Sequence, residues 1–200
     1  MKVRTACLCG IVFLTAGFCI SGCGSERDEN CLTIKKSGAV NQRIVEDFEE
    51  ENYDLEELRA KMEEEMDDYN GQAGGNSVEL TQLKESGGKL TMVTDYSSLE
   101  AYNEFNETAL FSGTIEEALK QEEKGYFSQE NLIKAKDGSQ IKTEEVVKDG
   151  ALMAIIVEEP VLYELEKKIL YYSENMEFVS DKCARLKDAQ SGPGYLIYKK

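Results

Sequence analysis

Histidine and tryptophan are both absent from the 200-residue chain. Without histidine, the chain has no base for Ser-His-Asp or Cys-His catalysis and cannot form an HExxH metalloprotease motif. Ordinary histidine-ligated zinc sites are excluded for the same reason. The absence of tryptophan disfavours a sugar-binding platform, although ten tyrosines offer another source of aromatic rings. A carboxylate-dependent enzyme therefore remains as the catalytic alternative to weigh.

Basic residues are scarce relative to acidic ones, with 23 Lys and Arg against 39 Asp and Glu and a net charge of −16. Such a surface repels nucleic acid and anionic lipid headgroups, so DNA and RNA binding are excluded. The acids are concentrated in residues 23–138, which makes this region the candidate contact for a cationic peptide, protein or cell-wall component. The alternative is a solvated acidic face that keeps the protein soluble.

The N-terminus carries two positive charges, Lys2 and Arg4, before an apolar stretch from Ala6 to Ile20. A stretch of about 15 residues is shorter than the roughly 18 that a membrane-spanning helix needs. Small residues and then a polar segment follow it, which is the order of a secretory signal peptide covering residues 1–22. The sequence has no second apolar stretch of this length, which argues against a multi-span membrane protein.

The end of the apolar stretch, Ile20-Ser21-Gly22-Cys23, resembles the lipobox of bacterial lipoproteins: an aliphatic residue, two small residues and a cysteine. The resemblance implies cleavage between Gly22 and Cys23 and a diacylglyceryl group on the Cys23 thiol, with acyl chains such as palmitate. Residues 23–30 would form the lipidated tether. Two acyl chains hold a protein stably at a membrane, so we expect it on the outer face of the cell membrane. The alternatives are an uncleaved membrane helix and a secreted protein cut at another position.

The mature chain is expected to be an α+β domain, mainly antiparallel sheet with two or three short helices. Residues 31–124 are interpreted as an acidic region of two ββα units and residues 125–200 as a β-rich region, both within one compact unit. In the first unit, apolar residues recur every three or four positions from Asp54 to Tyr69, which predicts a helix. The remaining elements of the two units are expected as strands at 32–34, 43–48, 78–84 and 90–96 and a helix opened by a capping box at 97–100.

A third, short helix is expected to begin at a further capping box, 114–117. Beyond it, Asp137-Gly138 and Asp149-Gly150 are typical of hairpin turns. The continuous apolar run Ala151–Val157 predicts a central strand that is buried on both faces. Further short strands are expected at 161–165, 169–172, 177–180 and 195–198.

Two cysteines remain in the mature chain besides the lipidated Cys23, namely Cys31 and Cys183. Outside the reducing cytosol, this single pair predicts a disulfide between the first strand and the C-terminal sheet. The alternative is two small buried hydrophobic residues, because cysteine packs well in cores. Two cysteines cannot form a four-cysteine zinc site, and no metal site is predicted.

The many carboxylates suggest two further sites. The loop 67–71 superficially resembles an EF-hand, but aligning Gly71 with the invariant glycine puts Met66 and Ser77 at the first and last ligand positions. An EF-hand is therefore rejected, and a solvated helix face is favoured over a looser calcium site. Glu158 and Glu159 follow the buried run and are the only candidates for an acid–base pair; the simpler interpretation is strand-end acids that face water.

These observations favour a non-enzymatic binding or scaffold module at the cell envelope. A carboxylate-dependent envelope hydrolase and an accessory lipoprotein of a membrane transporter are the alternatives. An enzyme would need a cleft with two convergent carboxylates, whereas a binding module would present a shallow patch or an open sheet edge. The mature domain is similar in general style to small lipoproteins of Gram-positive bacteria, a similarity that implies no activity, site or cofactor.

Overall fold

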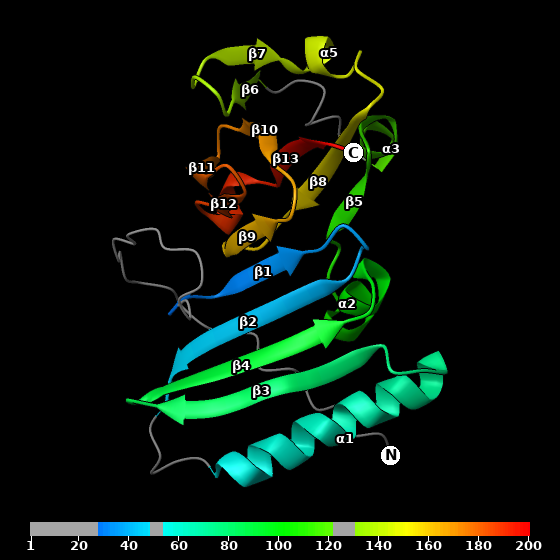
Figure 1. Ribbon diagram of the computed structural model, residues 1–200, viewed down its shortest axis with the longest axis vertical. Coiled ribbons are helices and arrows are strands. Elements are labelled where there is room, and N and C mark those ends of the chain that lie inside the picture. The colour runs from blue at the N-terminus through cyan, green and yellow to red at the C-terminus, as the bar shows by residue number, and fades with distance from the viewer. Residues whose placement is uncertain (1–27, 49–53, 122–130) are drawn as a thin grey trace.

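The computed structural model describes residues 28–48, 54–121 and 131–200, which form an α+β fold with two mostly antiparallel sheets (Figure 1). The predicted signal peptide, the predicted cleavage site at Gly22 and the predicted lipidation site at Cys23 lie outside the described residues. Within the described ranges, no helix has the length and apolar character that crossing a membrane requires.

The first sheet has the strand order β11-β12-β9-β1-β2-β4-β3. Neighbouring strands are antiparallel except for β1 and β9, which pair in parallel and join the N-terminal half of the fold to its C-terminal third. The long β2 pairs with β4 along its whole length, and β3 and β4 form a hairpin. The strands are β1 (Cys31–Ile34), β2 (Val40–Asp47), β3 (Val78–Ser86), β4 (Lys89–Tyr96), β9 (Leu162–Leu165), β11 (Met176–Ser180) and β12 (Cys183–Leu186).

The second sheet has the strand order β5-β8-β13-β10-β6-β7 and is antiparallel. Its β8 lies between β5 and β13, and the side chains of Ala154, Ile155 and Val157 have no exposed surface. The predicted central strand buried on both faces is therefore confirmed. The strands are β5 (Phe111–Thr114), β6 (Asn131–Lys134), β7 (Gln140–Lys142), β8 (Leu152–Val157), β10 (Ile169–Ser173) and β13 (Gly194–Lys199).

The two longest helices begin after residues whose side chains cap the helix N-terminus. Helix α1 (Leu55–Ala73) begins after Asp54, whose carboxylate accepts hydrogen bonds from the first-turn N–H groups, and ends at Gly74 with φ of 78°. It thus extends beyond the predicted end at Tyr69. Helix α2 (Leu99–Asn106) begins after Ser98, whose hydroxyl oxygen accepts a hydrogen bond from the Ala101 N–H.

Helix α3 (Ile115–Gln121) confirms the predicted capping box in both directions. The Thr114 hydroxyl oxygen accepts from the Glu117 N–H at 3.2 Å, and the Glu117 carboxylate accepts from the Thr114 N–H at 2.8 Å. A short α5 (Thr143–Val146) and a 3-10 helix (Ala189–Ser191) complete the described helices.

The largest hydrophobic cluster joins both sheets and the two longer helices. It contains Met66 of α1, Tyr102 of α2, Tyr163 of β9 and Ile155 and Leu196 of the second sheet. Figure 1 shows α1 running along β3, the edge strand of the first sheet. A second cluster packs α3 and α5 against the second sheet. The second sheet is therefore covered by apolar side chains on both faces.

Two details of the β-rich region differ from expectation. Asp137-Gly138 does form the turn of the β6–β7 hairpin, but Asp149-Gly150 connects α5 to β8 and is not a hairpin turn. The strands β5 and β12 were not predicted, because neither shows a clear alternation of apolar and polar residues. The strands β6 and β7 were expected only through the hairpin signal at Asp137-Gly138.

The strand order contradicts the predicted disulfide. Strand β9 lies between β1 and β12, so two strand spacings, about 9.5 Å together, separate the strands that carry Cys31 and Cys183. A disulfide needs Cα atoms within about 7 Å of each other. Both cysteine side chains are buried and pack with Leu162 of β9, which fits the alternative of small buried hydrophobic residues.

Candidate binding pocket at the junction of the two sheets

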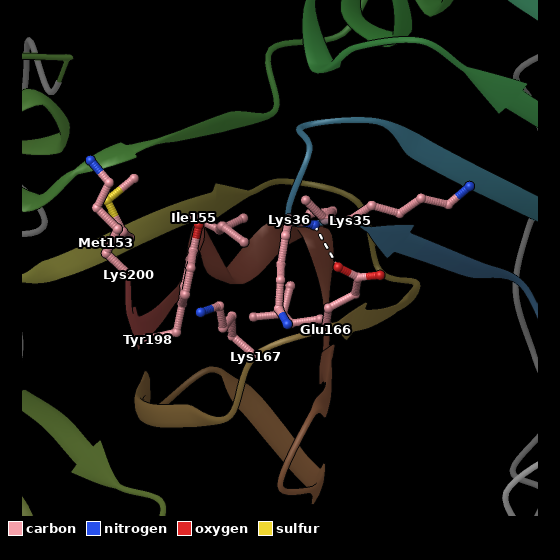
Figure 2. Close-up of a pocket in the computed structure, with 10 residues that line it drawn as sticks. Lys35, Lys36, Met153, Ile155, Glu166, Lys167, Tyr198 and Lys200 are labelled. Atoms are coloured by element: carbon pink, nitrogen blue, oxygen red, sulfur yellow. Dashed lines mark hydrogen bonds between the residues drawn. The ribbon is translucent and has the colours of Figure 1, made fainter.

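A pocket of about 250 Å³ opens where the first and second sheets meet. Its wall comes from the ends of β1 and β9 in the first sheet and from β8 and β13 in the second (Figure 2). Four segments that are distant in sequence therefore build one site. The lining residues are Ile34, Lys35, Lys36, Met153, Ile155, Leu165, Glu166, Lys167, Tyr198 and Lys200.

The floor of the pocket is the margin of the main core. Ile34, Ile155 and Leu165 belong to the largest hydrophobic cluster and are buried. Met153 and Tyr198 are paired across β8 and β13 and remain partly exposed, so they supply the apolar surface that a ligand can reach. The Tyr198 hydroxyl lies 3.5 Å from the Ser112 hydroxyl of β5, which leaves a polar group at the side of this wall.

The rim is held by a contact between two turns. After β1 the chain turns at Lys35–Gly38, where the Lys35 N–H donates to the Ala39 carbonyl and Gly38 has φ of 88°. The backbone N–H of Lys36 donates to the Glu166 carboxylate at 2.8 Å, a contact drawn in Figure 2. Because Glu166 directly follows β9, this hydrogen bond fixes the β1 turn beside the β9 turn and sets the shape of the pocket entrance.

The pocket has the opposite charge to the rest of the molecule. Four of its ten lining residues are lysines and one is a glutamate, whereas the whole chain has a net charge of −16. In Figure 2 the side chains of Lys36 and Lys167 extend through the middle of the group, while those of Lys35 and Lys200 point outward. The Lys35 ammonium lies 3.7 Å from the Asp95 carboxylate.

The side chains that line the pocket are suited to binding a ligand. Ammonium groups donate hydrogen bonds and attract anions, and the apolar wall excludes water from a ligand's body. Glu166 is the one carboxylate among the lining residues, and it already accepts the Lys36 N–H. An acid–base pair of two facing carboxylates is therefore not part of this pocket.

The predicted acid–base candidates lie elsewhere and differ from each other. Glu158 is exposed, whereas Glu159 is half-buried and accepts a hydrogen bond from the Tyr102 hydroxyl at 3.3 Å. Burial raises the pKa of the Glu159 carboxyl above its ordinary value, and the Tyr102 hydrogen bond partly opposes this shift. The Tyr163 hydroxyl donates to the Glu159 backbone carbonyl at 2.9 Å. These contacts anchor the end of β8 to α2 and β9.

Residues 67–71, which were expected to form a loop, lie within α1, and Asn70 of this helix connects it to the start of β3. The Asn70 side-chain oxygen accepts from the N–H groups of Ser77 and Val78, and its amide donates to the Val78 carbonyl at 2.8 Å. Asp67 and Asp68 are exposed on α1. Across residues 28–48, 54–121 and 131–200, no three Asp, Glu, Cys or His side chains come together as metal ligands.

Comparison with known proteins gives no relative: no family model, no curated protein and no solved structure matches the chain. The candidate site therefore depends on the geometry of this chain alone.

Sequence reasoning did not single out the pocket lysines. They lie in the segments 35–36, 166–167 and 198–200, each of which looks like an ordinary polar turn or terminus. The one available signal is that basic residues follow the ends of three strands, β1, β9 and β13. That signal becomes informative only when the pairing of β1 with β9 and of β8 with β13 is known.

Proposed function

We propose that this chain is a lipid-anchored, non-enzymatic binding module on the outer face of the cell membrane, and that the lysine-rimmed pocket is its binding site. The lipobox resemblance that ends at Cys23 supports the anchor. The observation that carries the binding role is a concave site with an apolar wall and several polar groups at its rim, the usual construction of a small-molecule site.

Two features favour binding over catalysis. The pocket lining combines cations with apolar side chains and has one carboxylate, which is engaged by the Lys36 backbone. Glu159, the carboxyl whose pKa burial raises, contacts the hydroxyl of Tyr102 and faces no second buried carboxylate in its described contacts. A carboxylate-dependent hydrolase, the alternative function, would need two such groups around one substrate. A cationic partner for the acidic face of α1 stays a separate prediction.

The proposal is tested by recovering the lipidated protein from its native envelope in polymer-bounded lipid discs, without detergent. The protein is then denatured, and the small molecules that it releases are identified by mass spectrometry. The control is Met153→Trp, which places a larger side chain in the partly exposed pocket wall. Both samples are first compared by circular dichroism, so that a folding defect is not mistaken for a filled pocket.

We expect one class of small molecule to be enriched in the wild type over Met153→Trp and to be recovered chemically unaltered after it is added back. Equal release from both proteins would reject the pocket as the binding site. Conversion of the added molecule into a product would reject the non-enzymatic proposal and favour the hydrolase.

A further inference from the structure

We propose that the pocket selects a small amphipathic oxyanion: one carboxylate or phosphate head bound by Lys36 and Lys167, with an apolar body of about one aromatic ring or a short acyl chain. This inference rests on the proposed binding function and specifies its ligand. The proposed ligand is an anion, although the net negative charge of the whole molecule favours cationic ligands.

The head group is assigned from the charges at the rim. Lys36 and Lys167 approach the middle of the pocket from the two turns that the Glu166 hydrogen bond holds together (Figure 2). Lys35 is directed toward Asp95, and Lys200 points outward, so these two contribute mainly to the local field. Lysine ammonium groups act as point charges with rotatable donors, which suits either a carboxylate or a phosphate.

The body of the ligand is assigned from the volume and the wall. The pocket measures about 250 Å³, below the range of roughly 300–1,000 Å³ that is usual for drug-sized ligands. A cavity of about 150 Å³ is known to hold a benzene molecule, so one substituted ring or a short chain fits here. Met153 and Tyr198 supply the accessible apolar contact, and the buried Ile155 lies behind them.

Glu166 gives the inference a directional test. Its carboxylate holds the Lys36 backbone but adds a negative charge next to the proposed head-group site. Glu166→Gln removes that charge and keeps an oxygen that accepts the same N–H. If the ligand is an anion, this substitution strengthens binding, whereas removing lysines weakens it. Damage to the fold would weaken binding in both cases.

The experiment uses the full lipidated chain in discs of phosphatidylcholine, with empty discs as the blank, and measures binding by isothermal titration calorimetry. The probes share one ring and differ in charge: benzoate, phenyl phosphate, benzyl alcohol and benzylamine. The test variant is Lys36→Gln/Lys167→Gln. Its matched control is Lys84→Gln/Lys89→Gln, which changes the net charge equally at two exposed residues of the β3–β4 hairpin that do not line the pocket. Figure 1 shows the turn of this hairpin at the opposite end of the first sheet from the end of β1.

We expect benzoate or phenyl phosphate to bind more tightly than benzyl alcohol, and benzylamine to bind weakest. Exposed charge pairs each contribute a few-fold to affinity, so the double lysine variant should weaken anion binding about tenfold. The hairpin control should stay within about twofold, and Glu166→Gln should bind anions more tightly. Added salt should weaken anion binding, because the rim is solvent-accessible. The preference between benzoate and phenyl phosphate then identifies the head group.

Equal affinity for benzoate and benzyl alcohol, together with no loss in the lysine variant, would overturn the assignment of an anion. Tighter binding of benzylamine would overturn it as well, because the acidic surface would then dominate the pocket. If none of the four probes binds, this ligand class is rejected. The proposed binding function would still be supported if the envelope-derived protein releases an unaltered molecule of another class. If the envelope-derived protein releases no molecule, both the ligand class and the proposed function are rejected.

Discussion

The substitution Gly194→Ala is expected to destabilise the protein, because side chains of the first sheet pack closely against the Gly194 backbone of β13. A Cβ atom added there would lie 2.2 Å from the sulfur of Met176 and 3.0 Å from a methyl carbon of Val157. It would also lie 3.1 Å from a methyl carbon of Leu186. Carbon–carbon contacts are normally about 3.5–4.0 Å, so these side chains would have to move. Met176 is 1% exposed and Leu186 is 1% exposed, which leaves little space for that movement.

Overpacking of this kind costs about 1–3 kcal/mol. With a urea m-value of about 2 kcal/mol/M, a loss of about 2 kcal/mol lowers the unfolding midpoint by about 1 M. The matched control is Gly71→Ala in α1, where nothing lies within 4 Å of the added carbon. Replacing a helical glycine with alanine stabilises a protein by about 0.5–1 kcal/mol, so this variant should unfold at higher urea.

The assay is urea unfolding followed by circular dichroism for the wild type and both variants. We expect the replacement of glycine by alanine to lower the urea midpoint of unfolding at Gly194 and to raise it at Gly71. If Gly194→Ala unfolds at the wild-type urea concentration, the close packing of β13 against β11 and β12 is refuted.

Three further predictions concern the core and its titratable groups. Ile155→Asp should cost several kcal/mol, because it places an unpaired charge at a fully buried position of β8, and soluble, fully folded variant protein would refute this. Burial raises the pKa of the Glu159 carboxyl above its ordinary value of 4.5. Between the unfolded-state and folded-state pKa values, the folded protein therefore keeps a proton that the unfolded chain has lost. The free energy of unfolding should fall as the pH rises through the folded-state pKa. Glu159→Gln should flatten this fall in urea midpoints measured from about pH 4 to pH 7, and an unchanged slope would exclude Glu159 as its source. Under denaturing, non-reducing conditions, Cys31 and Cys183 should both react with a thiol reagent, and a protein without reactive thiols would restore the predicted disulfide.

Several elements of the fold follow from local patterns in the sequence. The α1 periodicity and its Asp54 cap predict a helix from neighbouring residues alone, and the Thr114–Glu117 capping box does the same for α3. The apolar run of β8 predicts burial on both faces. In each case the determining residues lie within a single helix or strand, so no knowledge of distant contacts is needed.

The features that sequence reasoning missed depend on pairing between distant segments. The parallel pairing of Ile34 with Leu165 joins residues more than a hundred positions apart, and it determines both the pocket and the separation of the cysteines. The disulfide prediction assumed that the first and last sheet regions adjoin, but β9 is inserted between the two cysteine-bearing strands. The lysines of the pocket are ordinary turn residues until that pairing brings Lys36 beside Lys167.

Native mass spectrometry of the protein released from its own envelope tests the central claim most directly, because one spectrum reports both the anchor and the ligand. The account predicts a polypeptide that begins at Cys23 and carries acyl chains, together with a small molecule that dissociates on activation. It also predicts that the small molecule is depleted in Lys36→Gln/Lys167→Gln. A chain that retains residues 1–22 and carries no acyl groups would contradict the predicted anchor. An acylated chain that holds equal amounts of the small molecule in wild type and variant would contradict the predicted binding site.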